Sequence, residues 1–277
     1  MSGTLFVVAT PLGNLGDLSA RAAEVLRTVS VVAAEDTRHT RGLLSHLGAA
    51  PTLLSFHAYS QDRRLEGLLA MLRDGRDVAL VTDAGTPGVS DPGAELVAAA
   101  RGEDIAVVPI PGPSAVAAAL SASGLPADRY LFLGFLPRKG RERARLLGRA
   151  AAEEWSVVMF EAPGRLVPLL QDLGELAGQE RRVVVARELT KLHEELRAGT
   201  IAALTDYYSG IAPRGEVTVV LEGTGAPAEP ADRTDEAVEQ ATAMLAEGLT
   251  RREVARRITE SLGIPRNDAY RLVMGLP

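Results

Sequence analysis

Apolar runs of four to five residues alternate along the first 125 residues with longer stretches that repeat apolar positions at helical spacing. Short β-branched runs of this kind predict buried strands, and the stretches between them predict crossover helices. The expected strands cover residues 5–9, 29–33, 52–56, 78–81 and 105–108, and the expected helices cover 18–27, 40–47, 63–73, 94–101 and 115–121. The alternation predicts a mostly parallel sheet with helices on both faces.

The pattern pauses in the turn-rich residues 123–127 and then starts again. A second α/β unit is expected from strands at residues 130–136, 156–161, 182–187 and 217–221, with helices at 142–152, 166–176 and 201–208. Alanine, glycine and proline dominate residues 223–231, which is typical of a linker. The expected domains are an N-terminal α/β domain at 1–124, a C-terminal α/β domain at 125–224, a linker at 225–233 and a helical appendage at 234–277.

Composition narrows the class of protein. Hydrophobic residues make up 46% and charged residues 24% of the 277 residues, as in a soluble globular protein. No apolar run is long enough for a transmembrane helix or a signal peptide, and cysteine is absent, which excludes disulfides and thiolate chemistry. We therefore expect a cytoplasmic protein that uses no membrane. The net charge of −6 argues against a protein that wraps uniformly around nucleic acid, but it allows a basic face on part of the surface.

Four loops follow expected strands at the ends where α/β proteins bind ligands. They comprise residues 10–17, 34–39, 82–93 and 109–115. The loop at 82–93 has three glycines and two prolines, and we expect its backbone groups to stay free for a ligand. The loop at 34–39 brings Glu35 and Asp36 next to Arg38, although a helix N-cap at Asp36 or Thr37 also explains part of this pattern. The loop at 10–17 resembles a phosphate loop only weakly, and a plain glycine turn is equally compatible with it.

The order of these motifs resembles the tetrapyrrole-methylase-like superfamily, and within it the ribosomal RNA small subunit methyltransferase I family. The motifs that carry the resemblance are Thr10-Pro-Leu-Gly-Asn-Leu-Gly-Asp17, Ala34-Glu-Asp-Thr-Arg38, Asp83-Ala-Gly-Thr-Pro87 and Pro111-Gly-Pro-Ser-Ala115. Leu136-Pro-Arg-Lys-Gly140, Phe160-Glu-Ala-Pro-Gly-Arg165, Ala186-Arg-Glu-Leu-Thr-Lys191 and Pro213-Arg-Gly-Glu-Val217 extend it to about residues 4–222.

The resemblance implies two α/β domains of the class III methyltransferase type with a helical C-terminal appendage. It also implies a homodimer that binds S-adenosylmethionine between its α/β domains and methylates the 2′-hydroxyl of a cytidine in 16S rRNA of the small ribosomal subunit. The implied cofactor-binding residues are Pro11, Asp83, Ala84, Gly85, Thr86, Val89, Ser114 and Ala115, with backbone contacts near Glu161, Ala186 and Gly215. No metal ion and no DNA are expected.

Methyl transfer to a ribose hydroxyl requires in-line geometry and removal of one proton. Glu35, Asp36 and His57 are the candidates for the base or for positioning the hydroxyl, because each follows an expected strand. Arg38 would hold a carboxylate or an RNA phosphate. The sequence leaves the choice among these carboxylates and the histidine open.

An RNA substrate requires a local basic surface. The candidates are Arg138, Lys139, Arg141, Arg143 and Arg145, although a solvated helix face would have the same composition. In the tail, Thr250 and Glu253 form a capping-box pattern that starts a helix-turn-helix unit suited to RNA contacts. A plain helical hairpin packed on a dimer is the other interpretation of the tail.

Two other functions remain open from the sequence. One is C-methylation of a corrin or porphyrin precursor, and the other is a catalytically inactive RNA-binding module. The basic cluster and the helical tail favour RNA over a tetrapyrrole, and binding of S-adenosylmethionine would distinguish an enzyme from an inactive module.

Overall fold

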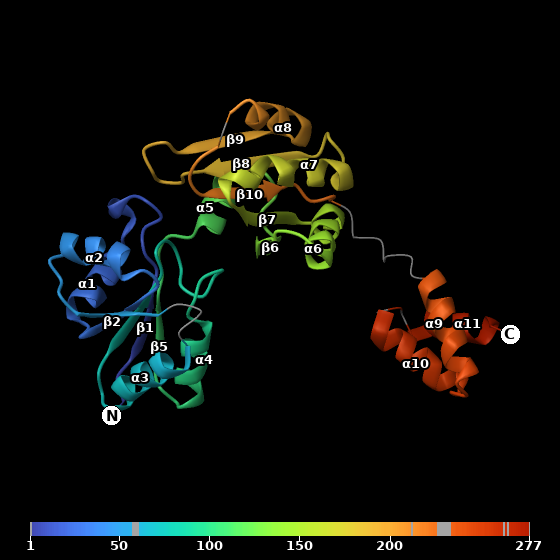
Figure 1. The fold of residues 1–277 in the computed structure, drawn as a ribbon, viewed down its shortest axis with the longest axis horizontal. Helices are drawn as coiled ribbons and strands as arrows, with labels where there is room; N and C mark the ends of the chain where they lie inside the picture. The colour runs from blue at the N-terminus through green and yellow to red at the C-terminus, as the bar shows by residue number, and fades with distance from the viewer. Residues whose placement is uncertain are drawn as a thin grey trace. The chain divides into compact units, whose positions relative to one another are not determined.

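The fold of the chain is given by a computed structural model that describes residues 2–56, 61–211, 213–225, 234–262, 264 and 266–276 (Figure 1). Residues 1–226 form one compact unit and residues 227–277 form another. Among the described helices, none has the length and apolar character needed to cross a bilayer.

The first sheet is fully parallel, with the strand order β3-β2-β4-β1-β5. Its strands are β1 (Leu5–Val8), β2 (Val31–Ala34), β3 (Thr52–Ser55), β4 (Val78–Val81) and β5 (Val107–Ile110). Helices α1 (Ala20–Thr28) and α2 (Thr37–His46) lie on one face, and α3 (Gln61–Arg73) and α4 (Ala94–Gly102) lie on the other (Figure 1). Because all strands run the same way, the loops after β1, β2, β4 and β5 meet at one edge.

The second sheet is mixed, with the order β6-β7-β10-β8-β9 and only β6 parallel to β7. Its strands are β6 (Tyr130–Phe135), β7 (Ser156–Glu161), β8 (Arg182–Arg187), β9 (Glu195–Thr200) and β10 (Val217–Leu221). Helices α6 (Arg141–Ala152), α7 (Leu166–Ala177) and α8 (Ile201–Ser209) enclose a large apolar core on one face. Two short 3-10 helices, Leu15–Asp17 and Pro163–Arg165, complete the connections.

Helix α5 (Ala115–Ser123) covers the opposite face of the second sheet. Its Val116, Ala119 and Leu120 pack with Val158, Val184 and Val220 in one buried cluster. The helix begins directly after β5 of the first sheet, so this contact connects the two α/β halves. The expected boundary between the two α/β domains at residue 124 stays a prediction. Helix α5 precedes that boundary in the sequence, yet it packs on the sheet of the second domain.

Residues 227–277 have a core of their own. Helices α9 (Thr234–Ala246), α10 (Arg251–Leu262) and α11 (Arg266–Gly275) pack through Ala237, Ala241, Val254, Ile258 and Val273, which are all fully buried. The backbone N–H of Glu253 donates to the Thr250 hydroxyl at 3.4 Å, as the capping pattern predicts.

The expected α/β class with a helical appendage is confirmed, while several element bounds differ by two or three residues and one strand was not expected. The strand expected at 105–108 lies at Val107–Ile110. Strand β9 was missed because its residues Glu195–Thr200 lack an apolar run. This edge strand is instead held by the ladder to β8, and its Glu195 binds Arg187 and Arg197 at 2.8 and 3.0 Å.

We predict that Leu120→Ala destabilises the protein by about 3 kcal/mol, because it opens a cavity where α5 packs on the second sheet. Leu120 is 6% exposed, whereas the control residue Leu176 on α7 is 54% exposed. In urea unfolding, Leu176→Ala should change the free energy of unfolding by no more than about 0.5 kcal/mol. Equal effects of the two substitutions would contradict this role of α5.

Candidate functional site

A cavity of about 260 Å³ opens at the carboxyl edge of the first sheet and is also walled by the second sheet. Its lining residues from the first half are Leu12, Thr82, Asp83, Ala84, Gly85, Thr86, Val89, Asp91, Ser114, Ala115 and Val116. Those from the second half are Phe135, Phe160, Glu161, Ala162, Pro163, Gly215, Glu216, Val217 and Thr218. Mostly apolar walls with a few polar groups are typical of a small-molecule site.

Backbone hydrogen bonds hold the glycine-rich loop after β4. Gly85 has φ +83° and forms an isolated antiparallel bridge with Thr10, whose N–H donates to the Gly85 carbonyl at 2.8 Å. The Gly85 N–H donates in return to the Thr10 carbonyl at 3.1 Å. The Thr86 hydroxyl donates to the Pro113 carbonyl at 3.2 Å. This corrects the expectation that the loop's backbone groups are all free, because those of Gly85 join the loops after β1 and β4.

Carboxylates gather where this loop meets the loop after β2. The Thr82 hydroxyl donates to Glu35 Oε2 at 2.8 Å, and Asp83 Oδ1 accepts from the Asp36 N–H at 3.0 Å. Burial raises the pKa of Asp83, against the lowering effect of that N–H. Burial also raises the pKa of Asp91 to about 6, and nearby Glu35 and Asp83 add to the rise. This side of the site therefore has a negative potential.

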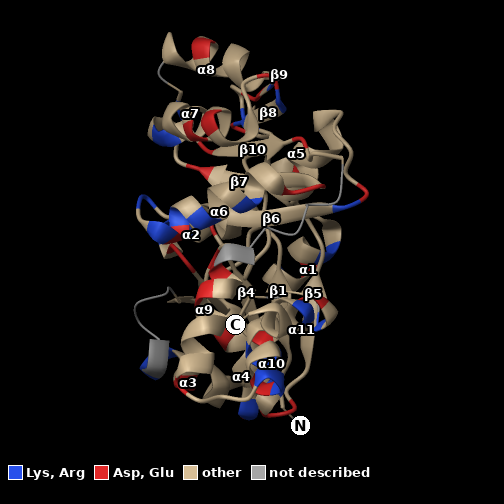
Figure 2. Ribbon diagram, turned by 90° about the vertical axis from the view of Figure 1, so that its right-hand side faces the viewer, with Lys and Arg blue, Asp and Glu red and all other residues tan. Residues whose placement is uncertain are grey.

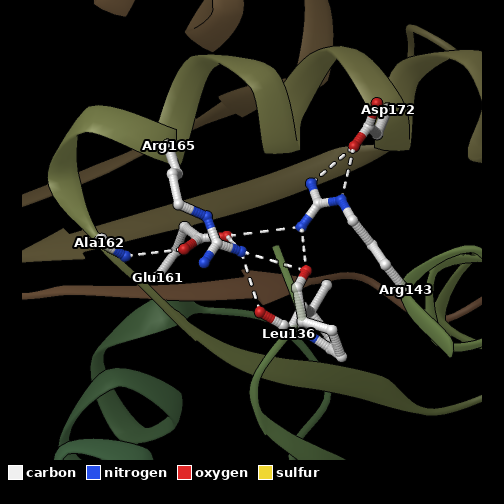
Figure 3. A network of polar contacts seen from close by, with 7 residues as sticks. Leu136, Arg143, Glu161, Ala162, Arg165 and Asp172 are labelled. Carbon is white, nitrogen blue, oxygen red and sulfur yellow. Dashed lines mark hydrogen bonds and ion pairs between the residues drawn. The ribbon is translucent and has the colours of Figure 1, made fainter. Parts of the chain in front are cut away.

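The opposite wall contains a buried ion-pair network (Figure 3). The Glu161 side chain, at the end of β7, has 0% exposure; it accepts from Arg165 Nη2 at 3.0 Å and from the Ala162 N–H at 2.8 Å. Arg143 Nη1 lies 3.8 Å from Glu161, and its Nη2 binds Asp172 at 2.6 Å. Arg165 also donates to the Leu136 carbonyl at 2.9 Å. The network thereby fixes the ends of β6 and β7 where they form the cavity wall.

A second hollow, a groove of about 640 Å³, adjoins the cavity and shares Leu12, Thr82, Asp83, Ala84 and Glu216 with it. Cationic side chains line it on both sides, with Arg38 from α2 and Lys191 from the loop after β8. Lys191 Nζ lies 3.1 Å from both Glu188 and Glu216. A Cβ built on Gly13 would come within 2.2 Å of the Lys191 side chain, so Gly13 allows this close approach.

Two of the residues proposed for catalysis, Asp36 and Arg38, bind each other in the structure. Asp36 caps α2 by accepting from the Arg38 N–H, and its carboxylate forms an ion pair with Arg38 at 2.6 Å. The Arg38 side chain and N–H hold the pKa of Asp36 at about 2, which makes it a weak base. Arg38 lines the groove. His57 lies outside the described residues.

The residues assigned to the cofactor are mostly together. Asp83, Ala84, Gly85, Thr86, Val89, Ser114, Ala115, Glu161 and Gly215 line the cavity. Pro11 lines the groove instead, and Ala186 is buried against α5. Sequence reasoning missed Asp91, although it lies in the same loop, and it missed Phe135 and Phe160, whose positions at strand ends were the available signal.

Figure 2 shows Lys and Arg along α6, and the burial of their side chains divides this basic segment into exposed and internal residues. Arg138, Lys139 and Arg141 are exposed, and exposed Arg145 pairs with Glu142 at 2.6 Å. Arg143 is not part of this surface, contrary to expectation, because its side chain is 11% exposed and is held by Asp172 and Glu161. Within the described parts of the chain, no group of three or more histidine and carboxylate side chains is placed to hold a metal ion.

Comparison with known proteins gives consistent relatives. Residues 4–205 match the family model for tetrapyrrole (corrin/porphyrin) methylases. A Synechocystis protein named ribosomal RNA small subunit methyltransferase I is 45% identical, with 99% of this chain and 98% of that protein covered. Proteins of the same name from Pseudomonas aeruginosa and Escherichia coli O157:H7 are 43% and 40% identical, with 97% and 98% of this chain and 96% and 95% of theirs covered.

Several solved structures have the same fold as most of this chain, although their sequence identity to it is low. Diphthine synthase aligns with a TM-score of 0.64 at 16% identity, covering 79% of this chain and 90% of that one. Uroporphyrin-III C-methyltransferase from Thermus thermophilus, complexed with S-adenosylhomocysteine, aligns with 0.58 at 19% identity, covering 79% and 97%. At these identities the likeness shows the fold alone.

We predict that Glu161→Gln destabilises the protein by about 3 kcal/mol, because it removes the buried countercharge of Arg165 and one of the two carboxylates that bind Arg143. The control Glu142→Gln removes an exposed carboxylate from its pair with Arg145 and should cost less than about 1 kcal/mol. Urea unfolding of both variants measures the difference. A Glu161→Gln protein as stable as the Glu142→Gln control would refute the structural role of the network.

Proposed function

The chain belongs to the tetrapyrrole methylase family and, within it, to the ribosomal RNA small subunit methyltransferase I group, and from this membership we propose that it methylates 16S rRNA with S-adenosylmethionine. The acceptor we propose is the 2′-hydroxyl of a cytidine in the small ribosomal subunit, and the enzyme would act in the cytoplasm as a homodimer. The observation that carries the proposal is the cavity and its adjoining groove, which share the wall formed by Thr82, Asp83 and Ala84.

The cavity fits the cofactor in its chemistry. Phe135, Phe160 and Val116 offer apolar surface for a purine, and the loop at Asp83–Thr86 offers backbone and side-chain polar groups for hydroxyls. Asp83 and Asp91 offer negative charge for a cationic group. When bound, S-adenosylmethionine supplies an electrophilic methyl group on a positively charged sulfur.

The groove fits a nucleotide. Arg38 lines it and would neutralise a phosphate next to the target ribose, whereas Lys191 is already paired with Glu188 and Glu216. Arg38 can exchange its exposed pair with Asp36 for a phosphate, since its side chain is 85% exposed. An acceptor in the groove and a donor in the cavity would meet at the shared wall, which is the proximity that a displacement at carbon requires.

The residues proposed for catalysis take different roles in this scheme. Glu35 holds the Thr82 hydroxyl at the shared wall, so we assign it to positioning. Asp36 orients Arg38, and its low pKa disfavours it as the base. His57 stays a candidate from the sequence.

The corrin or porphyrin alternative has weaker support. Its structural relatives are 18–24% identical to this chain, a range that carries the fold and no substrate. The relatives above 38% identity that cover nearly the whole chain are named for rRNA. An RNA substrate is therefore the better supported acceptor.

The decisive experiment mixes the full-length protein, methyl-labelled S-adenosylmethionine and small ribosomal subunits from a strain that lacks this enzyme. We expect label on one ribose of 16S rRNA, and mapping the labelled nucleotide tests the cytidine assignment. Subunits from the parent strain, already methylated, are the control. Absence of label in RNA despite measured cofactor binding would contradict the proposed acceptor.

We predict that replacing Arg138, Lys139 and Arg141 with glutamine weakens RNA binding uniformly and reduces the slope of log K against log salt by about two. A triple variant at Arg21, Arg76 and Arg101, which are exposed on the first half, should keep the parent slope. Filter binding across a salt series measures both. If both triple variants behaved alike, the surface at α6 would have no specific role.

A further inference from the structure

The charges around the cavity are not balanced. Its acidic lining residues are Asp83, Asp91, Glu161 and Glu216, and no arginine or lysine lines it among the described residues. Glu161 is neutralised by Arg165 and Arg143, and Glu216 by Lys191. Within the described part of the chain, Asp91 has no ion-pair partner. The cavity therefore exposes uncompensated negative charge to whatever it binds.

Of the two lining carboxylates without an ion-pair partner in the described chain, Asp83 accepts the Asp36 N–H, and Asp91 is the other. It is half-buried beside Thr82, whose hydroxyl favours the ionised form of Asp91 when its one proton points to Asp91 instead of to Glu35. Burial opposes ionisation more strongly, as do the carboxylates of Glu35, Asp83 and Glu216, which face it from the loop after β2, from its own loop and from the second half. The net effect raises its pKa to about 6. A positive charge beside Asp91 would relieve this repulsion, and a neutral group would not.

We propose that Asp91 determines ligand selectivity in this cavity, favouring the sulfonium form of the methyl donor over the neutral-sulfur product. The inference rests on the proposed function, because it assumes that S-adenosylmethionine occupies the cavity. Donor and product share the adenosine, the α-ammonium and the carboxylate, so the positive charge on sulfur is what distinguishes them electrostatically. An uncompensated carboxylate in partly desolvated surroundings senses that difference.

The charge changes during the reaction in a way that favours turnover. The acceptor oxygen forms a bond to the methyl carbon and loses its proton to solvent, while the carbon–sulfur bond breaks and its electron pair stays on sulfur. The positive charge next to Asp91 disappears in this step. The product is then bound less tightly than the donor. It dissociates, and a new donor molecule can bind in its place.

The pH dependence has a defined sign. The donor binds best to ionised Asp91, so its affinity should increase as the pH rises through about 6 and level off above it. Below that pH, binding of the donor must expel a proton from Asp91. The neutral-sulfur product gains little from ionised Asp91, so its affinity should change much less over the same range.

The test is isothermal titration calorimetry on the full-length protein with S-adenosylmethionine and S-adenosylhomocysteine, at pH 5.5 and 7.5 as about the lower and upper limits of the transition. We expect Asp91→Asn to weaken donor binding about tenfold at the higher pH and to change product binding by less than about twofold. The matched control is Asp104→Asn, on an exposed turn at φ +54° where asparagine is well tolerated.

A thermal readout checks the same carboxylate without ligand. Ionised Asp91 is unfavourable in the folded state, because burial raises its pKa there above the ordinary value of an aspartate. Asp91→Asn should therefore raise the Tm at pH 7.5 relative to the parent protein by about 2–4 °C, and the gain should vanish near pH 4. Asp104→Asn should show no such dependence.

The outcomes separate the two proposals. If neither ligand binds the parent protein, the proposed function itself fails. If both bind but Asp91→Asn weakens them equally, or changes neither, Asp91 does not sense the sulfur charge and the inference is overturned. The parent protein provides a test that needs no variant: donor affinity that rises from pH 5.5 to 7.5 while product affinity stays level supports the proposal, and parallel changes overturn it.

Discussion

The packing of α5 on the second sheet is the constraint on which the site depends. This helix leaves the first sheet at β5 and buries Val116, Ala119 and Leu120 against strands of the second. Residues at its start, Ser114 and Ala115, line the cavity, so the same few residues connect the halves and form a wall. A close-packed apolar contact of this kind fixes the positions of polar groups from the two sheets relative to one another. Flexible loops alone would not do so.

Around this contact, each wall of the cavity is stabilised by a different interaction. On the first half, the paired backbone bonds of Thr10 and Gly85 and the Thr86 hydroxyl join the loops after β1, β4 and β5. On the second half, buried Glu161 holds two arginines that in turn hold the ends of β6 and β7. A buried carboxylate needs such partners, so its charge fixes the wall without adding to the charge of the cavity.

Within residues 1–226, the charges that line the cavity differ from those that line the groove. This difference matches the two ligands expected of the enzyme, a methyl donor and an RNA. The cavity presents carboxylates of which Asp91 has no cationic partner among the described residues, which suits a cationic methyl donor. The groove next to it presents Arg38, whose side chain is 85% exposed, which suits a phosphodiester. The shared wall at Thr82, Asp83 and Ala84 is where the two potentials meet.

The sequence alone determined the α/β class, the helical tail and most of the cavity-lining loops, because these depend on local patterns. Apolar runs specify buried strands, and the glycines of the loop at 82–93 specify positive φ wherever the rest of the chain lies. Only the tertiary structure decided which charges are free. Arg143 and Asp36 look like exposed functional groups in the sequence, and both are held by partners. Asp91 looks like a turn residue, yet it faces the cavity without an ion-pair partner in the described chain. The reason is physical: a side chain's charge state and availability depend on burial and on neighbours that are distant in sequence, and no local pattern encodes them.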